Sequence, residues 1–329
     1  MSDRILIITN GDSAVDTLKE AGIVADFLPW RDVLHDGPVP ANLTLEELSI
    51  IRAKFISERG WGEYEDAINN FKERDKRLAT SGDYEEVILW FEHDLYDQLQ
   101  LIQLLDWFSQ HEFKKTKLSI ICKDEFVANS SKGRLLVNYS DRSEITSNQL
   151  ASGYQSWLAF CSPNPKKIVE VVNQETPHLP YLQSAFLRLL QEYPDKENGL
   201  SRNQSQILKI VQSNMTQPGE IFKESHKMEE ANYLGDASFW QHMYGMNHCD
   251  FPLLQTEGSK PFFLPSSLNP DQEFLQQRLI LTELGQNVIQ NKANWVEING
   301  IDKWLGGVHV TRKTLWYWDN TKQILIKEE

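Results

Sequence analysis

The apolar and polar positions in the first 145 residues alternate between strand-like and helix-like segments. Short, nearly continuous apolar runs, typical of strands buried on both faces, lie at residues 5–9, 24–29, 86–91 and 117–122. Apolar residues recur at helical spacing between and after these runs, at residues 13–21, 45–60, 63–79 and 95–109. Strands separated by helix-length segments predict a mainly parallel sheet with right-handed crossovers. We therefore expect residues 1–145 to form a Rossmann-like, three-layer α/β domain.

Several of the expected helices start with residues that can bond free backbone N–H groups. Asp12 or Ser13 is the expected N-cap of the first helix, and Gly22 is its expected end. The spacing of a capping box occurs three times, at 44–47, 146–149 and 201–204. These signals support the helical interpretation of the segments that follow them.

The pattern changes after residue 145. Residues 146–195 lose the strand signals and predict a helical connector, which prolines interrupt at 163 and 165. The next segments predict three helices near 201–213, 216–225 and 236–243, strands at 252–254 and near Phe262, and a strand followed by a helix over 278–289. This order resembles a winged helix-turn-helix. We expect a winged-helix-like α+β domain over 196–329, closed by a β-hairpin around Leu315–Trp318.

Composition narrows the class of protein. The chain has 329 residues, of which 40% are hydrophobic, so it has ample material for a buried core. No segment approaches the ~20 consecutive apolar residues that span a bilayer, and the N-terminal residues lead into a strand without an apolar signal region. These features predict a cytoplasmic protein without a membrane partner. The three cysteines are widely spaced, which argues against a disulfide framework and a cysteine zinc site.

Charge bears on nucleic-acid binding. The formal net charge of −14 argues against broad affinity for nucleic acids, which depends on lysines and arginines at phosphates. The helix expected to read bases in a winged helix, "DASFWQHMYG", contains neither lysine nor arginine. DNA binding is therefore less favoured than a packing or protein-contact role for this segment. The sequence does not indicate an oligomeric state.

Polar residues follow each predicted strand of the first domain, and ligands of such sheets bind at the carboxyl ends of the strands. We expect these residues to converge on one edge. The candidate catalytic residues are His93, Asp12 and Asp94. The candidate ligand-binding residues are Asn10, Gly11, Ser13, Arg31, Asp32 and His35, and Glu92 is the candidate metal ligand.

Three interpretations of this edge stay open. The carboxylates and histidines suit a divalent metal, while Arg31 and the helix start at Ser13 suit an anion. This combination points to an enzyme that acts on a phosphorylated or nucleotide-like small molecule, with His93 as acid or base. Alternatively, Gly11-Asp12-Ser13 resembles the first block of the Gly-Asp-Ser hydrolases, although their later Asp-x-x-His and Gly-x-Asn-Asp blocks are missing. In the third interpretation these residues only cap helices and form ion pairs.

Motifs for common cofactors are missing from the sequence. The chain contains neither the G-x-G-x-x-G dinucleotide fingerprint nor the Walker phosphate loop, which argues against a conventional NAD enzyme or P-loop NTPase. The competing functional class is a noncatalytic regulator, whose first domain senses a ligand and whose winged-helix-like domain contacts DNA or a protein.

Several long phrases resemble one bacterial family. In the first half these are "NGDSAVDTLKEAGI", "PWRDVLHDGPVP" and "LWFEHDLYDQLQLIQLL", and in the second half "YLGDASFWQHM", "LTELGQ" and "NGIDKWLGGVHV". They are similar to the domain-of-unknown-function family number eighteen thirty-five and to the C-terminal region that usually accompanies it. The resemblance covers roughly residues 4–125 and 200–318. It implies a bacterial origin and a two-part architecture, and it brings no known reaction.

Overall fold

The computed structural model describes residues 4–113, 115–174, 177–258, 260–266 and 270–328. The chain divides into two compact units. Unit 1 consists of residues 1–187 and 306–308, and unit 2 of residues 188–305 and 309–329. In the described ranges, no helix has both the length and the apolar character needed to cross a membrane.

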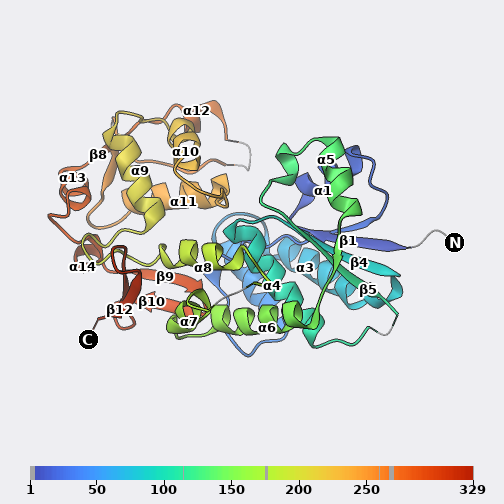
Figure 1. The fold of residues 1–329 in the computed structure, drawn as a ribbon. Coiled ribbons are helices and arrows are strands. Elements are labelled where there is room, and N and C mark those ends of the chain that lie inside the picture. The colour runs from blue at the N-terminus through green and yellow to red at the C-terminus, as the bar shows by residue number, and fades with distance from the viewer. Residues whose placement is uncertain (1–3, 114, 175–176, 259, 267–269, 329) are drawn as a thin grey trace. The chain divides into compact units, whose positions relative to one another are not determined.

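Unit 1 is built on a five-stranded sheet with the order β2-β1-β4-β5-β6 (Figure 1). Its strands are β1 (Ile5–Thr9), β2 (Asp26–Pro29), β4 (Glu86–Phe91), β5 (Lys117–Cys122) and β6 (Ser143–Glu144). The first four are parallel, and β6 runs antiparallel to β5. The predicted mainly parallel sheet is thereby confirmed. The two exposed residues of β6, and the two-residue strand β3 (Gly37–Pro38), are too short to leave a pattern in the sequence.

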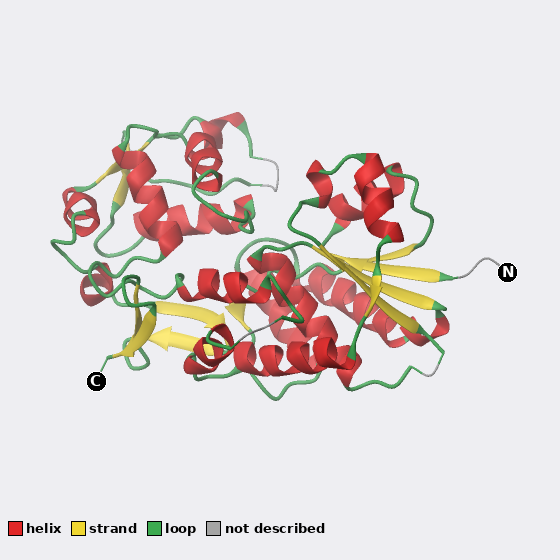
Figure 2. Cartoon of the chain, viewed as in Figure 1, coloured by secondary structure: helices red, strands yellow, loops and turns green. Residues whose placement is uncertain are grey.

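Helices cover both faces of this sheet (Figures 1 and 2). On one face lie α1 (Asp12–Glu20) and α5 (Lys132–Ser140), and on the other α3 (Tyr64–Ala79), α4 (Leu95–Ser109) and α6 (Ser147–Cys161). The remaining helices of this part of the chain are α2 (Leu45–Glu58), α7 (Lys166–Val172) and α8 (Leu182–Leu190). The expected α/β class, with a mainly parallel sheet between helices, is confirmed for unit 1.

The strand residues explain this layered packing. Side chains alternate between the two faces of a strand, so Ile7, Ile88 and Trp90 share one face and pack against Leu18 of α1 and Leu135 of α5. All six residues of β4 are buried, which explains why its sequence is continuously apolar rather than alternating.

The helix starts follow the predictions with one exception. The capping boxes at 44–47, 146–149 and 201–204 are all present. The expected N-cap of the first helix is wrong, however. Gly11 is the N-cap of α1 and no side chain caps it, because the Asp12 carboxylate bonds Arg31 instead and Ser13 already lies inside the helix.

Unit 2 combines short helices with small antiparallel sheets. The elements of this part of the chain are α9 (Arg202–Gln212), α10 (Pro218–His226), α11 (Asp236–Asn247), β7 (Leu254–Thr256), α12 (Gln272–Leu275), β8 (Leu279–Leu281), α13 (Glu283–Ile289), α14 (Trp295–Asn299), β9 (Asp302–Gly306), β10 (Val308–Thr311), β11 (Trp316–Asp319) and β12 (Ile324–Lys327). The last residue of β9 and the first of β10 belong to unit 1. Strand β7 pairs with β8, and β11 pairs with β12. The predicted closing hairpin is confirmed.

The strand predicted near Phe262 is wrong. The described residues 260–266 contain no strand, and β7 pairs with β8 instead. Pro261 and Pro265 flank this segment and cannot donate to a ladder. Its amides bond side chains: Phe262 N–H donates to Asn247 Oδ1 and Phe263 N–H to Gln277 Oε1.

Candidate functional site

The candidate site lies where the chain path reverses along the sheet of unit 1. From β1 the chain passes to β2 on one side, and later enters β4 on the other side of β1. In open α/β sheets, ligands bind in the crevice outside the carboxyl ends of such a strand pair. Here Asn10 follows β1, and Glu92 follows β4. Residues of these two strand ends can therefore meet.

Three carboxylates meet at this point. Glu92, Asp94 and Asp97, named the carboxylate cluster below, each offer an oxygen within 4.8 Å of the others. Their side chains come from the end of β4 and the first turn of α4, which the sequence "FEHDLYD" encodes in one stretch. All three residues are buried, at 7%, 3% and 0% exposure.

Hydrogen bonds fix the geometry of the carboxylate cluster. Asn10 Nδ2 donates to Asp97 Oδ1 at 2.8 Å, and Glu92 N–H donates to Asp97 Oδ2 at 2.5 Å. Asp94 caps α4 by accepting the Asp97 N–H at 3.2 Å. Glu92 Oε1 accepts the Val127 N–H at 2.7 Å. The cluster is thus tied to the segments that follow β1 and β5, the strands on either side of β4.

Burial dominates the electrostatics of the carboxylate cluster. It raises the pKa of Glu92, raises the pKa of Asp94 to about 7, and raises the pKa of Asp97 well above the ordinary aspartate value. The negative charges of the neighbouring carboxylates push the pKa values of Asp94 and Asp97 in the same direction. No arginine or lysine in the described ranges forms an ion pair with any of the three. At neutral pH the cluster must either hold protons or attract a cation.

The candidate base His93 lies beside the cluster in sequence and packs against aromatic rings. Its ring centroid is 5.0 Å from that of Phe126 and 5.9 Å from that of Tyr181. Burial lowers the pKa of His93, so its imidazole is neutral at pH 7. Its Nδ1 has no hydrogen-bond partner among the described residues, and neither nitrogen bonds Ser13. The catalytic pair that a serine hydrolase needs is therefore not formed.

The residues of the "NGDS" turn separate into two groups. Asn10 belongs to the cluster, whereas Asp12 pairs with Arg31: Nε–Oδ2 is 2.6 Å and Nη2–Oδ1 is 2.5 Å. Both side chains of this pair are more than half exposed, and the hydrogen bond from Arg31 lowers the pKa of Asp12. Ser13 is exposed, and a Cβ built on Gly11 would touch nothing within 4 Å. The space in front of the α1 N-terminus is open.

Asp32 and His35 are buried, and each contacts a residue that the sequence analysis overlooked. Asp32 Oδ1 accepts a 2.9 Å hydrogen bond from Nε of Arg52, which is fully buried. The ring of His35 meets the edge of Tyr96 at 5.8 Å, and the Tyr96 hydroxyl donates to the Asn10 carbonyl. In the sequence, the one feature that points to a buried role for Arg52 is its position on the apolar side of an amphipathic helix.

The described geometry therefore brings together Asn10, Glu92, Asp94 and Asp97. It places Asp12 with Arg31 and Asp32 with Arg52 as separate ion pairs.

No family model matches the chain, and no curated protein matches it. The resemblance to the bacterial family of unknown function stays a prediction.

Proposed function

We propose that unit 1 is a Rossmann-like enzyme that acts on a phosphorylated or nucleotide-like small molecule, with a divalent cation held by the carboxylate cluster. The observation that carries this proposal is a contrast between buried carboxylates. Seven acidic residues are buried in the described part of the chain. Four of them have a basic partner: Asp32 pairs with Arg52, Glu86 with Arg142, Glu192 with Arg188, and Asp319 with Lys196.

The other three buried acids are the members of the carboxylate cluster. Burying a charge without a partner is costly, and perturbed acids in a strand-end crevice are typical of functional sites. Three carboxylates are hard oxygen ligands that suit Mg²⁺ or Mn²⁺. A cation there would bind phosphate oxygens and neutralise charge at the reacting group.

Two further features fit an anionic substrate. The first-turn amides of α1 have no side-chain cap, and the space in front of Gly11 is open. A helix N-terminus with free amides favours an anion. Neutral His93 could accept a proton at pH 7, and Arg31 would contribute charge once released from Asp12.

Cation binding tests this proposal directly. Calorimetric titration of the chelator-treated protein with Mn²⁺ should give one site per chain, which Asp94→Asn and Asp97→Asn each weaken at least tenfold. Asp16→Asn, an exposed aspartate on α1, is the matched control. Screening phosphate monoesters and nucleotides with Mn²⁺ or with chelator should then show turnover that depends on the cation. Wild-type protein that binds neither Mn²⁺ nor Mg²⁺ would contradict the proposal.

The second candidate is a ligand-sensing regulator in which unit 2 is a winged-helix-like domain. Three helices precede the β7–β8 pair, and Leu279 N–H bonds the Thr216 carbonyl between α9 and α10, as in a three-stranded wing. In α11 only Gly245 is exposed, and the helix has neither lysine nor arginine. This favours a packing role or protein contact over base reading. Salt-dependent binding to duplex DNA, measured by fluorescence anisotropy, would favour the DNA-binding form of this candidate.

We further propose that the chain belongs to the family it resembles.

A further inference from the structure

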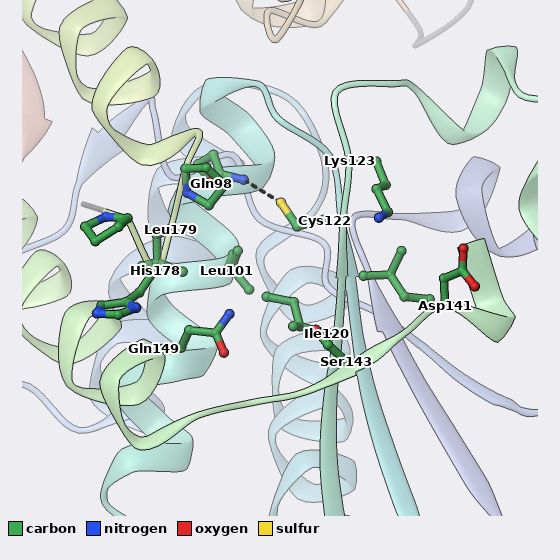
Figure 3. A pocket seen from close by; sticks show the side chains of 13 residues that line it. Gln98, Leu101, Ile120, Cys122, Lys123, Asp141, Ser143, Gln149, His178 and Leu179 are labelled. Atoms are coloured by element: carbon green, nitrogen blue, oxygen red, sulfur yellow. Dashed lines mark hydrogen bonds between the residues drawn. The ribbon is translucent and has the colours of Figure 1, made fainter. Parts of the chain in front are cut away.

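Unit 1 contains a pocket at the uncovered part of the β5 edge (Figure 3). Strand β6 pairs with β5 at Ser119 and Ile120, Ile145 N–H donates to the Leu118 carbonyl, and β5 continues past Ile120 to Cys122. The pocket lies at this end and has a volume of about 230 Å³. That is roughly the volume of eight liquid waters at ~30 Å³ each. A metabolite of amino-acid size fits such a volume, whereas a dinucleotide does not.

One part of the pocket is apolar, with an amide in its wall. Leu101, Ile120 and Leu179 present apolar side chains. Gln98 Nε2 bonds Cys122 Sγ at 3.3 Å, which fixes the amide beside this apolar surface. Burial raises the pKa of Cys122 to about 12, so its thiol is neutral. This part of the pocket suits an uncharged, apolar group.

The other part carries two opposite charges. Lys123 and Asp141 line the pocket, and Figure 3 shows both on the side of β5 opposite to Gln98, Leu101 and Leu179. Asp141 is exposed and Lys123 is half-buried. Neither side chain forms an ion pair or a hydrogen bond with a residue in the described ranges, and the two do not pair with each other. A single anion would be attracted by Lys123 and repelled by Asp141. A ligand with both charges would satisfy both residues.

We propose that this pocket binds a zwitterionic α-amino acid with an apolar side chain. Lys123 pairs with the ligand carboxylate and Asp141 with its ammonium group. The ligand passes over the uncovered edge of β5, so that its apolar side chain lies against Leu101, Ile120 and Leu179. The carboxylate cluster has no part in this binding, so the proposal is independent of the proposed catalytic function.

The experiment uses the full chain in chelator, so that the outcome does not depend on a cation. Saturation-transfer NMR with L-leucine, L-valine and L-methionine detects binding, and calorimetry with L-leucine gives the affinity. We expect one site, with 4-methylpentanoate and 3-methylbutylamine each binding at least tenfold more weakly, because each lacks one charge. Lys123→Met and Asp141→Asn should each weaken L-leucine at least tenfold. Lys72→Met and Asp16→Asn, which alter exposed residues outside the pocket, should not.

Three outcomes would overturn this assignment. The first is that none of the three amino acids binds. The second is equal affinity for L-leucine and for either singly charged analogue, which would identify the ligand as a simple anion or a simple cation. The third is binding unchanged by Lys123→Met and Asp141→Asn. Both variants alter side chains outside the hydrophobic core, and thermal melting confirms that each is folded before titration.

Discussion

Replacing Asp94 by asparagine should stabilise the cation-free protein at neutral pH. Burial raises the pKa of Asp94 from 3.8 to about 7 in the folded protein. Between these values the folded protein keeps a proton that the unfolded chain has released. The free energy of unfolding therefore falls as pH rises through this range and is constant above it. Asparagine removes the charge, and it also serves as an N-cap, so the bond to the Asp97 N–H is kept.

The size of this effect follows from the pKa shift. A shift of about 3 units corresponds to about 4 kcal/mol at 1.36 kcal/mol per unit. Asp94→Asn should be more stable than wild type by up to this amount above pH 7, and equally stable below pH 4. A divalent cation narrows this difference, because it binds the charged wild-type cluster more tightly than it binds the variant. At a hundred times its dissociation constant it stabilises the wild type by about 2.7 kcal/mol.

Hydrogen exchange measured by mass spectrometry on the β1 and β4 peptides is the suitable assay. It reports the opening of this sheet even though the chain has two units. Measurements at pH 4, 6 and 8, with chelator and with Mn²⁺, show whether the stability difference between the two proteins grows with pH and shrinks with the cation. Asp16→Asn is the control and should change the free energy of opening by less than about 0.5 kcal/mol. Asp94→Asn less stable than wild type at pH 8 in chelator would refute the reasoning.

Three other substitutions or modifications test the packing of unit 1. Arg52→Met leaves buried Asp32 unpaired and should lower the free energy of unfolding by about 3–5 kcal/mol in urea denaturation, while Lys54→Met, on the exposed side of the same helix, should be nearly neutral. Gly37→Ala should lower the free energy of unfolding more than Gly60→Ala does. Both glycines have a positive φ, but only at Gly37 would a Cβ meet the Phe55 ring, at 2.6 Å. Equal losses of stability in urea denaturation would contradict this clash. Because burial raises the pKa of Cys122 to about 12, iodoacetamide at pH 8 should alkylate it about a thousandfold more slowly than an unperturbed thiol, as followed by peptide mass spectrometry.

Most of the helix and strand positions in unit 1 could be predicted from the local sequence. The apolar run of β4 and the periodic apolar positions of α4 are read directly from consecutive residues, and both elements have the predicted bounds. The capping residue Thr44 also acts within four residues of chain. Such features depend on near neighbours, so a single sequence is enough to predict them.

The candidate site was predictable only where one sequence stretch supplies it. Glu92, Asp94 and Asp97 lie within six residues, and the strand-end rule places them at the edge of the sheet. The partner Asn10 lies 87 residues from Asp97, and it follows from the expectation that the strand ends converge.

Pairings between charged residues could not be predicted in the same way. The sequence offers Arg31 beside Asp32, yet Arg31 bonds Asp12 and Asp32 bonds Arg52. In a strand or extended segment, neighbouring side chains point in opposite directions, so adjacency in sequence argues against contact. Arg52 reaches Asp32 because α2 turns its Leu48, Arg52 and Phe55 face inward, whereas the neighbouring apolar residue Ile51 is only half-buried. The need to neutralise a buried carboxylate, which no hydrophobic pattern records, thus shifts the buried face of this helix.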